Sequence, residues 1–114
     1  MHAGVLGTKS GLTAPGEQRT VVLEEGSRIT LNTRTRIAVH LARHVREVVL
    51  RDGEAFFEVS KDASRPFTVR TSIGSARAIG TRFDVYLEDN HLSVTTQEGK
   101  VMLATPVGGG MASW

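Results

Sequence analysis

Cysteine is absent from this 114-residue chain, which excludes disulfides and thiolate metal sites and leaves the compartment open. Aromatic residues make up only 5% of the sequence, and no apolar run approaches the ~18 residues that a membrane-spanning helix needs. Neither sign of charge is in large excess, because 14 Lys and Arg are nearly balanced by 12 Asp and Glu, for a formal net charge of +2. Since these charges are interleaved, the dense basic stretch typical of nucleic-acid binders is missing, and we expect no nucleic-acid partner.

The remaining composition is that of an ordinary globular protein, with 39% hydrophobic and 23% charged residues. A chain of this length can bury one core, so we expect a single domain. Hydrophobic and polar residues alternate over short segments, and no segment sustains the 3.6-residue period of a helix. About ten short strands are therefore expected, over 19–23, 28–32, 33–41, 45–50, 54–59, 67–71, 76–79, 82–87, 92–96 and 101–103. The predicted fold class is all-β.

The stretch 50–70 organises the rest of the chain. Asp52-Gly53 is a turn signal, because glycine accepts positive φ without strain, and a strand is expected on each side of it. In the second of these strands Phe57 points to one face and Phe56 to the other. A polar loop follows, and Pro66 introduces a third strand. The predicted core aromatics are Phe57, Phe67 and Phe83. Truncation of Phe57 or Phe67 to Ala is expected to cost roughly 3–5 kcal/mol.

Glycines recur at the expected turns. Gly26, Gly53 and Gly99 each follow an acidic residue and precede an alternating strand, and Gly80 is a weaker copy. The equal spacing of Gly26, Gly53 and Gly80 is typical of coiled β architectures in which one lap stacks on the next. We expect a coiled, solenoid-like or double-stranded β-helix arrangement. A β-sandwich or jelly roll is the alternative, because β proteins turn every 8–12 residues in any case.

No reactive constellation is evident, so we expect neither an enzyme nor a cofactor. His40 and His44 have a spacing that suits zinc on a helix, but a strand and a turn destroy that geometry. Glu54 and Glu58 share a strand face at about 13 Å, which is too far apart for a glycosidase pair. We interpret these carboxylates as solvent-facing partners of Arg residues on neighbouring strands.

One possible partner face can be named. Arg34 and Arg36 are expected to alternate on an exposed strand face, with Arg28, Arg46 and Arg70 next to them on other strands. A solvated face balanced by Glu is the more ordinary interpretation. Phe56 points away from Phe57, so it either leaves the core as a docking residue or meets a second covered face.

Four motifs lie in order along the chain. They are Gly-Glu-x-Arg-x-Val-x-Leu-x-x-Gly-Ser-x-Ile-x-Leu-Asn (Gly16 to Asn32), Gly-Glu-Ala-Phe-Phe-Glu-Val (Gly53 to Val59), Arg-Pro-Phe-x-Val (Arg65 to Val69) and Gly-Thr-x-Phe-x-Val (Gly80 to Val85). Together they resemble the FecR domain over about residues 13–103.

The resemblance implies cell-surface signalling. FecR-type proteins are single-pass transmembrane regulators of sigma factors in Gram-negative bacteria, and this domain is their periplasmic part. The implied partners are the signalling domain of a TonB-dependent outer-membrane receptor, often for iron chelates, the rest of the same regulator, and site-specific proteases. Regulated proteolysis then frees an extracytoplasmic-function sigma factor. Contact with the membrane would come only from a helix outside this sequence.

The resemblance also sets the expected domain boundaries: an N-terminal lead-in over 1–12 and the FecR-like periplasmic domain over 13–104. Three consecutive glycines and the ending Met-Ala-Ser-Trp indicate a flexible linker or tag remnant over 105–114. From the residues themselves, Gly26, Gly53, Gly80 and Gly99 are expected in turns of positive φ. Asn32 ends an apolar strand, where its side chain can bond loop amides and carbonyls.

Two other classes of function stay open at this point. A small-molecule or glycan-binding β domain is compatible with an all-β architecture, and a ligand would then raise the melting temperature in proportion to its occupancy. A module that associates with itself by adding strands edge to edge is the third.

Overall fold

The computed structural model describes residues 7–14, 16–105 and 111–113, and side chains within 13–105. Its elements are β1(Gly7–Leu12), β2(Arg19–Val22), β3(Arg28–Leu31), β4(Arg36–Ala42), β5(Val45–Glu58), β6(Phe67–Arg70), β7(Ser75–Ala78), β8(Arg82–Glu88), β9(His91–Glu98), β10(Val101–Ala104) and β11(Met111–Ser113). Within these described ranges, none of the chain forms a helix able to span a membrane.

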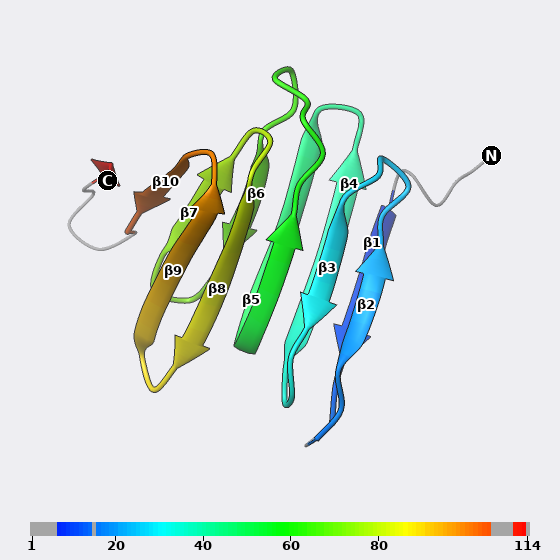
Figure 1. Cartoon of the computed structure of the whole chain (residues 1–114), viewed down its shortest axis with the longest axis vertical. Coiled ribbons are helices and arrows are strands. Elements are labelled where there is room, and N and C mark those ends of the chain that lie inside the picture. The colour runs from blue at the N-terminus through cyan, green and yellow to red at the C-terminus, as the bar shows by residue number, and fades with distance from the viewer. Residues whose placement is uncertain (1–6, 15, 106–110, 114) are drawn as a thin grey trace.

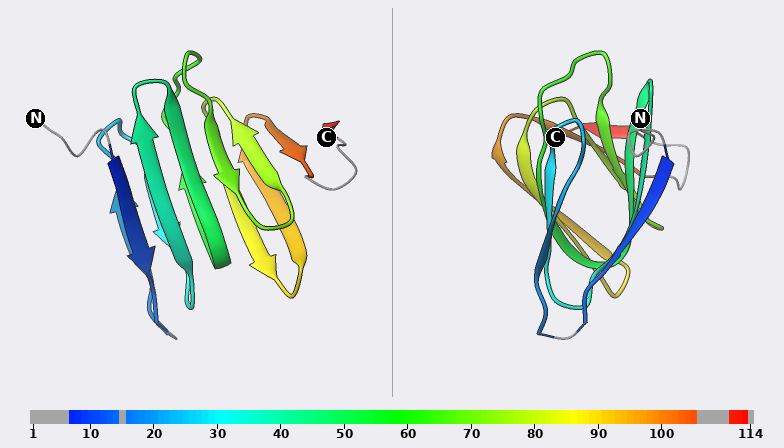
Figure 2. Two further views of the ribbon diagram at one scale, coloured as in Figure 1. Left: turned by 180° about the vertical axis from the view of Figure 1, so that it is seen from behind. Right: turned by 90° about the vertical axis from the view of Figure 1, so that its right-hand side faces the viewer.

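The strands form two layers that face each other (Figures 1 and 2). The first layer runs β1-β4-β5-β6-β7-β10-β11, and the second contains β2, β3, β5, β8 and β9. All of these pairings are antiparallel except the parallel pair of β5 with β6. The 14-residue strand β5 belongs to both layers, since its first half pairs with β4 and its second half with β3 and β8.

The Asp52-Gly53 pair lies inside β5, so the expectation of a tight turn between two strands is wrong. Gly53 does have positive φ, at 97°, and the register between β4 and β5 shifts beside it. This irregularity changes which side chains face inward, from Val48 and Leu50 before it to Ala55 and Phe57 after it. The residues that looked like a hairpin turn instead let one strand pass from the first layer to the second.

The core lies between the inner faces of the two layers. Phe57, Phe67 and Phe83 are each 0% exposed. The ring of Phe57 stacks on Phe83 at 5.2 Å and meets Phe67 edge-on at 5.8 Å between centroids. These contacts join β5, β8 and β6, so the aromatic cluster connects the two layers.

The all-β prediction is confirmed, and the coiled arrangement is not. Antiparallel neighbours in two facing layers correspond to the sandwich alternative, and the regular glycine spacing does not mark stacked laps. Gly26 and Gly99 have positive φ, at 103° and 88°, but Gly80 does not, so the expected left-handed turn there is wrong. Gly80 is instead needed for space, because a Cβ would lie 2.8 Å from the Cα of Lys61.

The structure also differs from the expected ends and from one expected strand. β1 lies inside the supposed lead-in and pairs with β4 over six positions, and β11 lies in the supposed flexible tail and pairs with β10. The rest of that tail, 106–110 and 114, falls outside the described residues. The expected strand 33–41 begins only at Arg36, because Thr33 and Arg34 form a turn in which Arg34 has φ of 54°.

Candidate functional site

Arg46 is fully buried at one end of the two layers. Its side chain is 0% exposed and pairs with the carboxylate of Glu25, which is 8% exposed, at 2.7 Å between Nη1 and Oε2. The guanidinium also donates to the backbone carbonyls of Arg65 (2.7 Å), Ser60 (2.8 Å) and Ile79 (3.1 Å). It lies 5.6 Å from the centroid of the Phe67 ring. One buried cation thus ties the β2–β3 turn, the loop after β5 and the residues after β7 together.

Glu25 is held as a carboxylate in this network. Burial alone would raise its pKa, but hydrogen bonds from the Ser27 side chain, from Arg46, from the Ser27 backbone and from Ser60 lower the pKa below its ordinary value. The Ser27 hydroxyl donates to Oε2 at 2.7 Å and the Ser60 hydroxyl at 3.0 Å. A buried pair of this kind is stable only when its remaining hydrogen-bonding groups are satisfied, as they are here.

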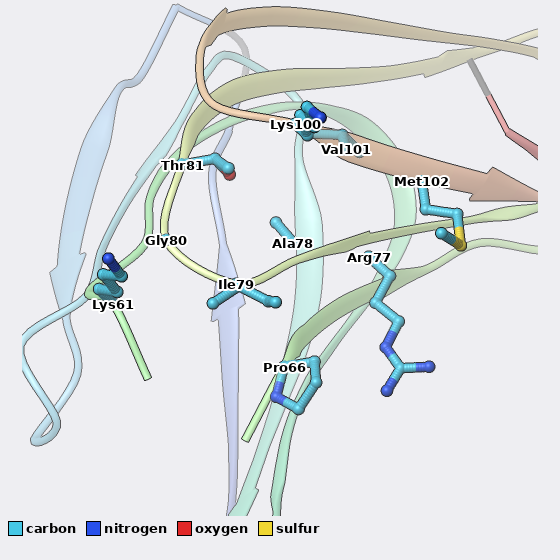
Figure 3. A pocket seen from close by; sticks show the side chains of 10 residues that line it. All are labelled: Lys61, Pro66, Arg77, Ala78, Ile79, Gly80, Thr81, Lys100, Val101 and Met102. Atoms are coloured by element: carbon cyan, nitrogen blue, oxygen red, sulfur yellow. The ribbon is translucent and has the colours of Figure 1, made fainter. Parts of the chain in front are cut away.

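A pocket of about 600 Å³ lies where β7 ends and β10 begins, beside the segments that Arg46 holds (Figure 3). Arg77 and Ala78 come from β7, and Val101 and Met102 from β10. The other walls come from the loop after β5, the β7–β8 connection and the β9–β10 turn; they are Lys61, Pro66, Ile79, Gly80, Thr81 and Lys100.

The pocket has an apolar floor and a cationic rim. Ile79 and Met102 are exposed over 45% and 47% of their surface, whereas the rim cations are Lys61, Arg77 and Lys100. No acidic residue is among the described residues that line it. The arrangement is suited to binding an anionic group with an apolar part, and it lacks the paired nucleophile and base that catalysis would need.

Glycines give the pocket its shape. Because Gly99 has φ of 88° and a Cβ there would overlap the Thr81 side chain, the β9–β10 turn packs directly on the β7–β8 connection. Thr81 is 5% exposed, and its Oγ1 is buried without a hydrogen-bond partner within the described part of the chain. Gly80 and Gly99 therefore let three separate segments meet at the pocket wall.

A second polar site lies on the outer face of the second layer. Glu54 of β5 and Asp84 of β8 share a hydrogen bond, and the Asn32 amide donates to Glu54 at 2.9 Å. Burial, the hydrogen bond with Glu54 and the charge of Glu54 raise the pKa of Asp84 to about 7. The hydrogen bond with Asp84 and that with Asn32 lower the pKa of Glu54, against the effect of burial. Below about pH 7 the two carboxyl groups therefore share one proton, held mainly by Asp84.

Phe56 borders this carboxyl pair. Its ring is half-buried, lines a small hollow with Glu54 and Asp84, and lies 5.9 Å from the Arg82 guanidinium. Arg82 in turn faces Glu58 at 3.9 Å, an Arg–Glu contact of the kind expected for Glu58. Glu54 differs from that expectation, because its side chain is hydrogen-bonded to Asp84 and Asn32 and forms no ion pair with an Arg in the described part of the chain.

The predicted partner face is not a single surface. Arg36 lies on β4 in the first layer, where it pairs with Asp52 at 2.6 Å, and Arg34 lies in the preceding turn. Phe56 points outward from the second layer, on the opposite side of the molecule. Arg46, expected beside Arg34, is buried, so the grouping of these arginines is wrong.

The contacts of Asn32 agree in part with its expected role. Its side-chain Oδ1 accepts from the backbone amide of Thr33 at 2.9 Å, but its side-chain amide donates to the Glu54 carboxylate, and the bond to the Glu54 carbonyl comes from the Asn32 backbone N–H. His40 and His44 are exposed, on β4 and in the β4–β5 hairpin. Over the residues described, no group of three or more His, Asp or Glu is placed to hold a metal ion.

Sequence reasoning missed the three features that shape these sites. The burial of Arg46 was predictable from the sequence. It lies two residues before Val48 and four before Leu50 on the same strand, so its side chain points to the same face as theirs, toward the core. The Glu54–Asp84 pair and the pocket join residues that are distant in sequence, and no local pattern indicates them.

Comparisons with known proteins agree with this architecture. The sequence model of the family described as FecR protein matches residues 11–102. Two crystal structures of a "putative anti-sigma factor" from Parabacteroides distasonis, at 2.50 and 1.65 Å resolution, superpose with a TM-score of 0.80. They are 31% and 32% identical and cover 89% and 88% of this chain. The match covers 49% of each of those chains, so this chain spans about half their length.

A comparison with curated proteins found no match. The family match nevertheless extends over most of the sequence and over both layers of the fold, from the end of β1 into β10. The chain therefore belongs to the FecR family.

Proposed function

We propose that this chain is the periplasmic signalling module of a transmembrane anti-sigma regulator. It performs no chemistry; it relays the state of a TonB-dependent outer-membrane receptor, such as one for iron chelates, to an extracytoplasmic-function sigma factor. The observation that carries the proposal is the FecR match over residues 11–102, together with the similarity to solved anti-sigma factor structures. The described surface offers a pocket for contact, lined by apolar and cationic side chains.

The relay requires a direct or shared contact with a protein partner. The end of the module where Arg46 holds three segments together is suited to transmit such a contact, because these segments are already tied to one another before a partner binds. Proteolysis of the regulator would then depend on whether the protein partner is bound to this module. The same surface could be contacted by the remainder of the regulator, which is the second partner we propose.

Sedimentation velocity tests whether the chain binds this partner. The purified chain is mixed with the periplasmic signalling domain of the receptor encoded beside its regulator. A complex that forms reversibly at micromolar concentration is expected. Absence of a complex, both with the receptor domain and with the remainder of the regulator, would contradict the proposal. Turnover of a substrate by the chain alone would also contradict it.

A small-molecule-binding function remains the second candidate, and one observation favours it. The pocket at the ends of β7 and β10 has the volume of a ligand site, about 600 Å³. If a small ligand raised the melting temperature with saturation, and no protein partner bound, this second function would be preferred.

A further inference from the structure

We propose that the pocket between the end of β7 and the start of β10 binds a short protein segment whose apolar side chain is flanked by carboxylates. This inference deepens the proposed function, and it depends on that function only for the partner's identity. It rests on the floor of the pocket, the charge of its rim and the way the rim is built.

The floor is an uncovered apolar surface. Ile79 and Met102 are two of the few large hydrophobic side chains of the described residues that are more than a third exposed, and both line this pocket. Pro66 adds a third apolar contact, and Figure 3 shows Ile79 between Pro66 and Gly80. An apolar side chain inserted here would remove this surface from water.

The positive charges of the rim are not paired with acidic residues in the described part of the chain. Lys61, Arg77 and Lys100 are exposed, and none has an ion pair with any residue that the structure describes. Arg77 lies opposite two neutral residues, Thr68 on β6 and Met102 on β10.

Ion pairing alone does not set these cations apart. Arg36, Arg70 and Arg82 each face an acidic residue across a neighbouring strand. Other exposed cations, such as Arg19 and Arg28, have no ion pair with a described residue. What distinguishes the pocket is that three cations and no described acidic residue line one apolar surface, so a partner's carboxylates would supply the negative charge there.

The spacing of the cations favours a chain over a single small anion. Lys61 comes from the loop after β5, Arg77 from β7 and Lys100 from the β9–β10 turn. In Figure 3 they stand on different sides of the apolar floor and do not converge on one point. A small carboxylate would meet one of them, whereas a peptide can place one carboxylate near each and its apolar side chain between them.

The walls are already held in place. Arg46 donates to the carbonyl of Ser60, next to Lys61, and to the carbonyl of Ile79. Binding therefore does not have to order these segments, and this reduces its entropic cost.

The test is selection from a library of random 12-residue peptides displayed on phage, with the purified chain as bait. We expect the enriched peptides to carry Asp or Glu on both sides of an apolar residue, and to bind more weakly as salt increases. Anisotropy titrations of one enriched peptide then compare Lys100→Glu and Ile79→Ser with Arg19→Glu. Arg19 is an exposed cation on β2, at the opposite edge of the molecule (Figure 1).

The two pocket variants should weaken binding by roughly tenfold or more, and Arg19→Glu should leave it unchanged. Circular dichroism confirms that each variant is folded. Three results would overturn the inference: no enrichment, enriched peptides without acidic residues, or equal binding to all three variants. A parallel titration with dodecanoate separates the small-molecule alternative, since saturable binding of dodecanoate without peptide enrichment would also overturn it.

The peptide-binding test and the test of the relay can fail separately. A chain that selects acidic, apolar peptides but forms no complex with the receptor domain or the regulator would retain the inference and refute the relay. A complex with the receptor domain that tolerates Lys100→Glu and Ile79→Ser would retain the relay and refute the inference.

Discussion

The Nη1 atom of Arg46 lies 2.7 Å from the Oε2 atom of Glu25, and both side chains are almost completely removed from water. Two charges are stable in such a place only if every remaining donor and acceptor is paired. The backbone carbonyls of Ser60, Arg65 and Ile79 complete the set. The pair therefore specifies how three loops meet, and the pocket lies beside them.

Replacing Arg46 by Met should destabilise the fold strongly. The change leaves the Glu25 carboxylate and three carbonyls buried without their donor, a situation that costs about 3–5 kcal/mol. Urea unfolding followed by circular dichroism measures the loss, with Arg82→Met as the control. Arg82 makes a half-exposed contact with Glu58 at 3.9 Å, so its loss should cost less than about 1 kcal/mol. Equal midpoints for the two variants would show that the buried pair has no special role.

The double variant Arg46→Met/Glu25→Gln should recover part of this loss. It removes the uncompensated charge, although the carbonyls stay unpaired. A double variant as unstable as the sum of its two single variants would mean that the pair contributes no coupling.

Gly53→Ala should disturb β5 more than the same change at another left-handed glycine. An Ala at Gly53 would adopt φ of 97° and would also place its Cβ 2.7 Å from the Arg34 carbonyl oxygen. Gly16 has φ of 79° with nothing within 4 Å of a Cβ, so Gly16→Ala isolates the backbone strain, about 1–2 kcal/mol. We expect the Gly53 variant to lose clearly more stability in thermal unfolding. Similar losses at the two glycines would refute the role of close packing where β5 changes layers.

Asp84 should make stability depend on pH in a defined window. Its pKa is about 7 in the fold, compared with 3.8 as the ordinary value, so the folded state binds more protons between those values. This group therefore destabilises the fold as pH rises through that window, and its cost is complete above pH 7. The lowered pKa of Glu54 acts in the opposite direction, but only below its ordinary value of 4.5.

Asp84→Asn should therefore gain stability relative to the wild type between about pH 5 and about pH 8. Urea midpoints of the two proteins at both pH values measure this difference. Asp89→Asn is the matched control, since Asp89 is exposed in the β8–β9 turn. If the difference between Asp84→Asn and the wild type were the same at both pH values, the shared proton would be disproved.

Phe57→Ala should cost roughly 3–5 kcal/mol, whereas Phe56→Ala should cost clearly less. Phe57 is 0% exposed and contacts two other rings, while its neighbour is half-buried under Arg82. Equilibrium unfolding in urea distinguishes them. Comparable losses would mean that the outer face of the second layer is as tightly packed as the core.

The inward faces of the strands were predictable because burial in a sheet follows a two-residue period. Phe83, Val85 and Leu87 of β8 are all buried, as the alternation indicates, whereas the row expected on β9 weakens to an exposed Thr96 near the edge of its layer. The alternation does not reveal which strands pair. Asp52-Gly53 has the same local signature whether the chain reverses or continues, and only the pairings of both halves of β5 distinguish the two cases.

The pocket could not be predicted because it is assembled from separate segments. Lys61 and Lys100 look like ordinary solvated cations in sequence, and only the fold brings them to one apolar floor. Glu54 and Asp84 likewise belong to different strands, and their shared proton depends on the register of β5 with β8. Arg46 is different, since its position in phase with two buried residues was visible in the sequence.

The central claim, that this FecR domain signals by contact through its pocket, is tested most directly in cells. A reporter driven by the sigma factor is measured with and without the receptor's ligand, in strains whose regulator carries Ile79→Ser, Lys100→Glu or Arg19→Glu at normal abundance. The account predicts that the two pocket variants lose the response to ligand and that Arg19→Glu keeps it. A full response in both pocket variants would contradict it.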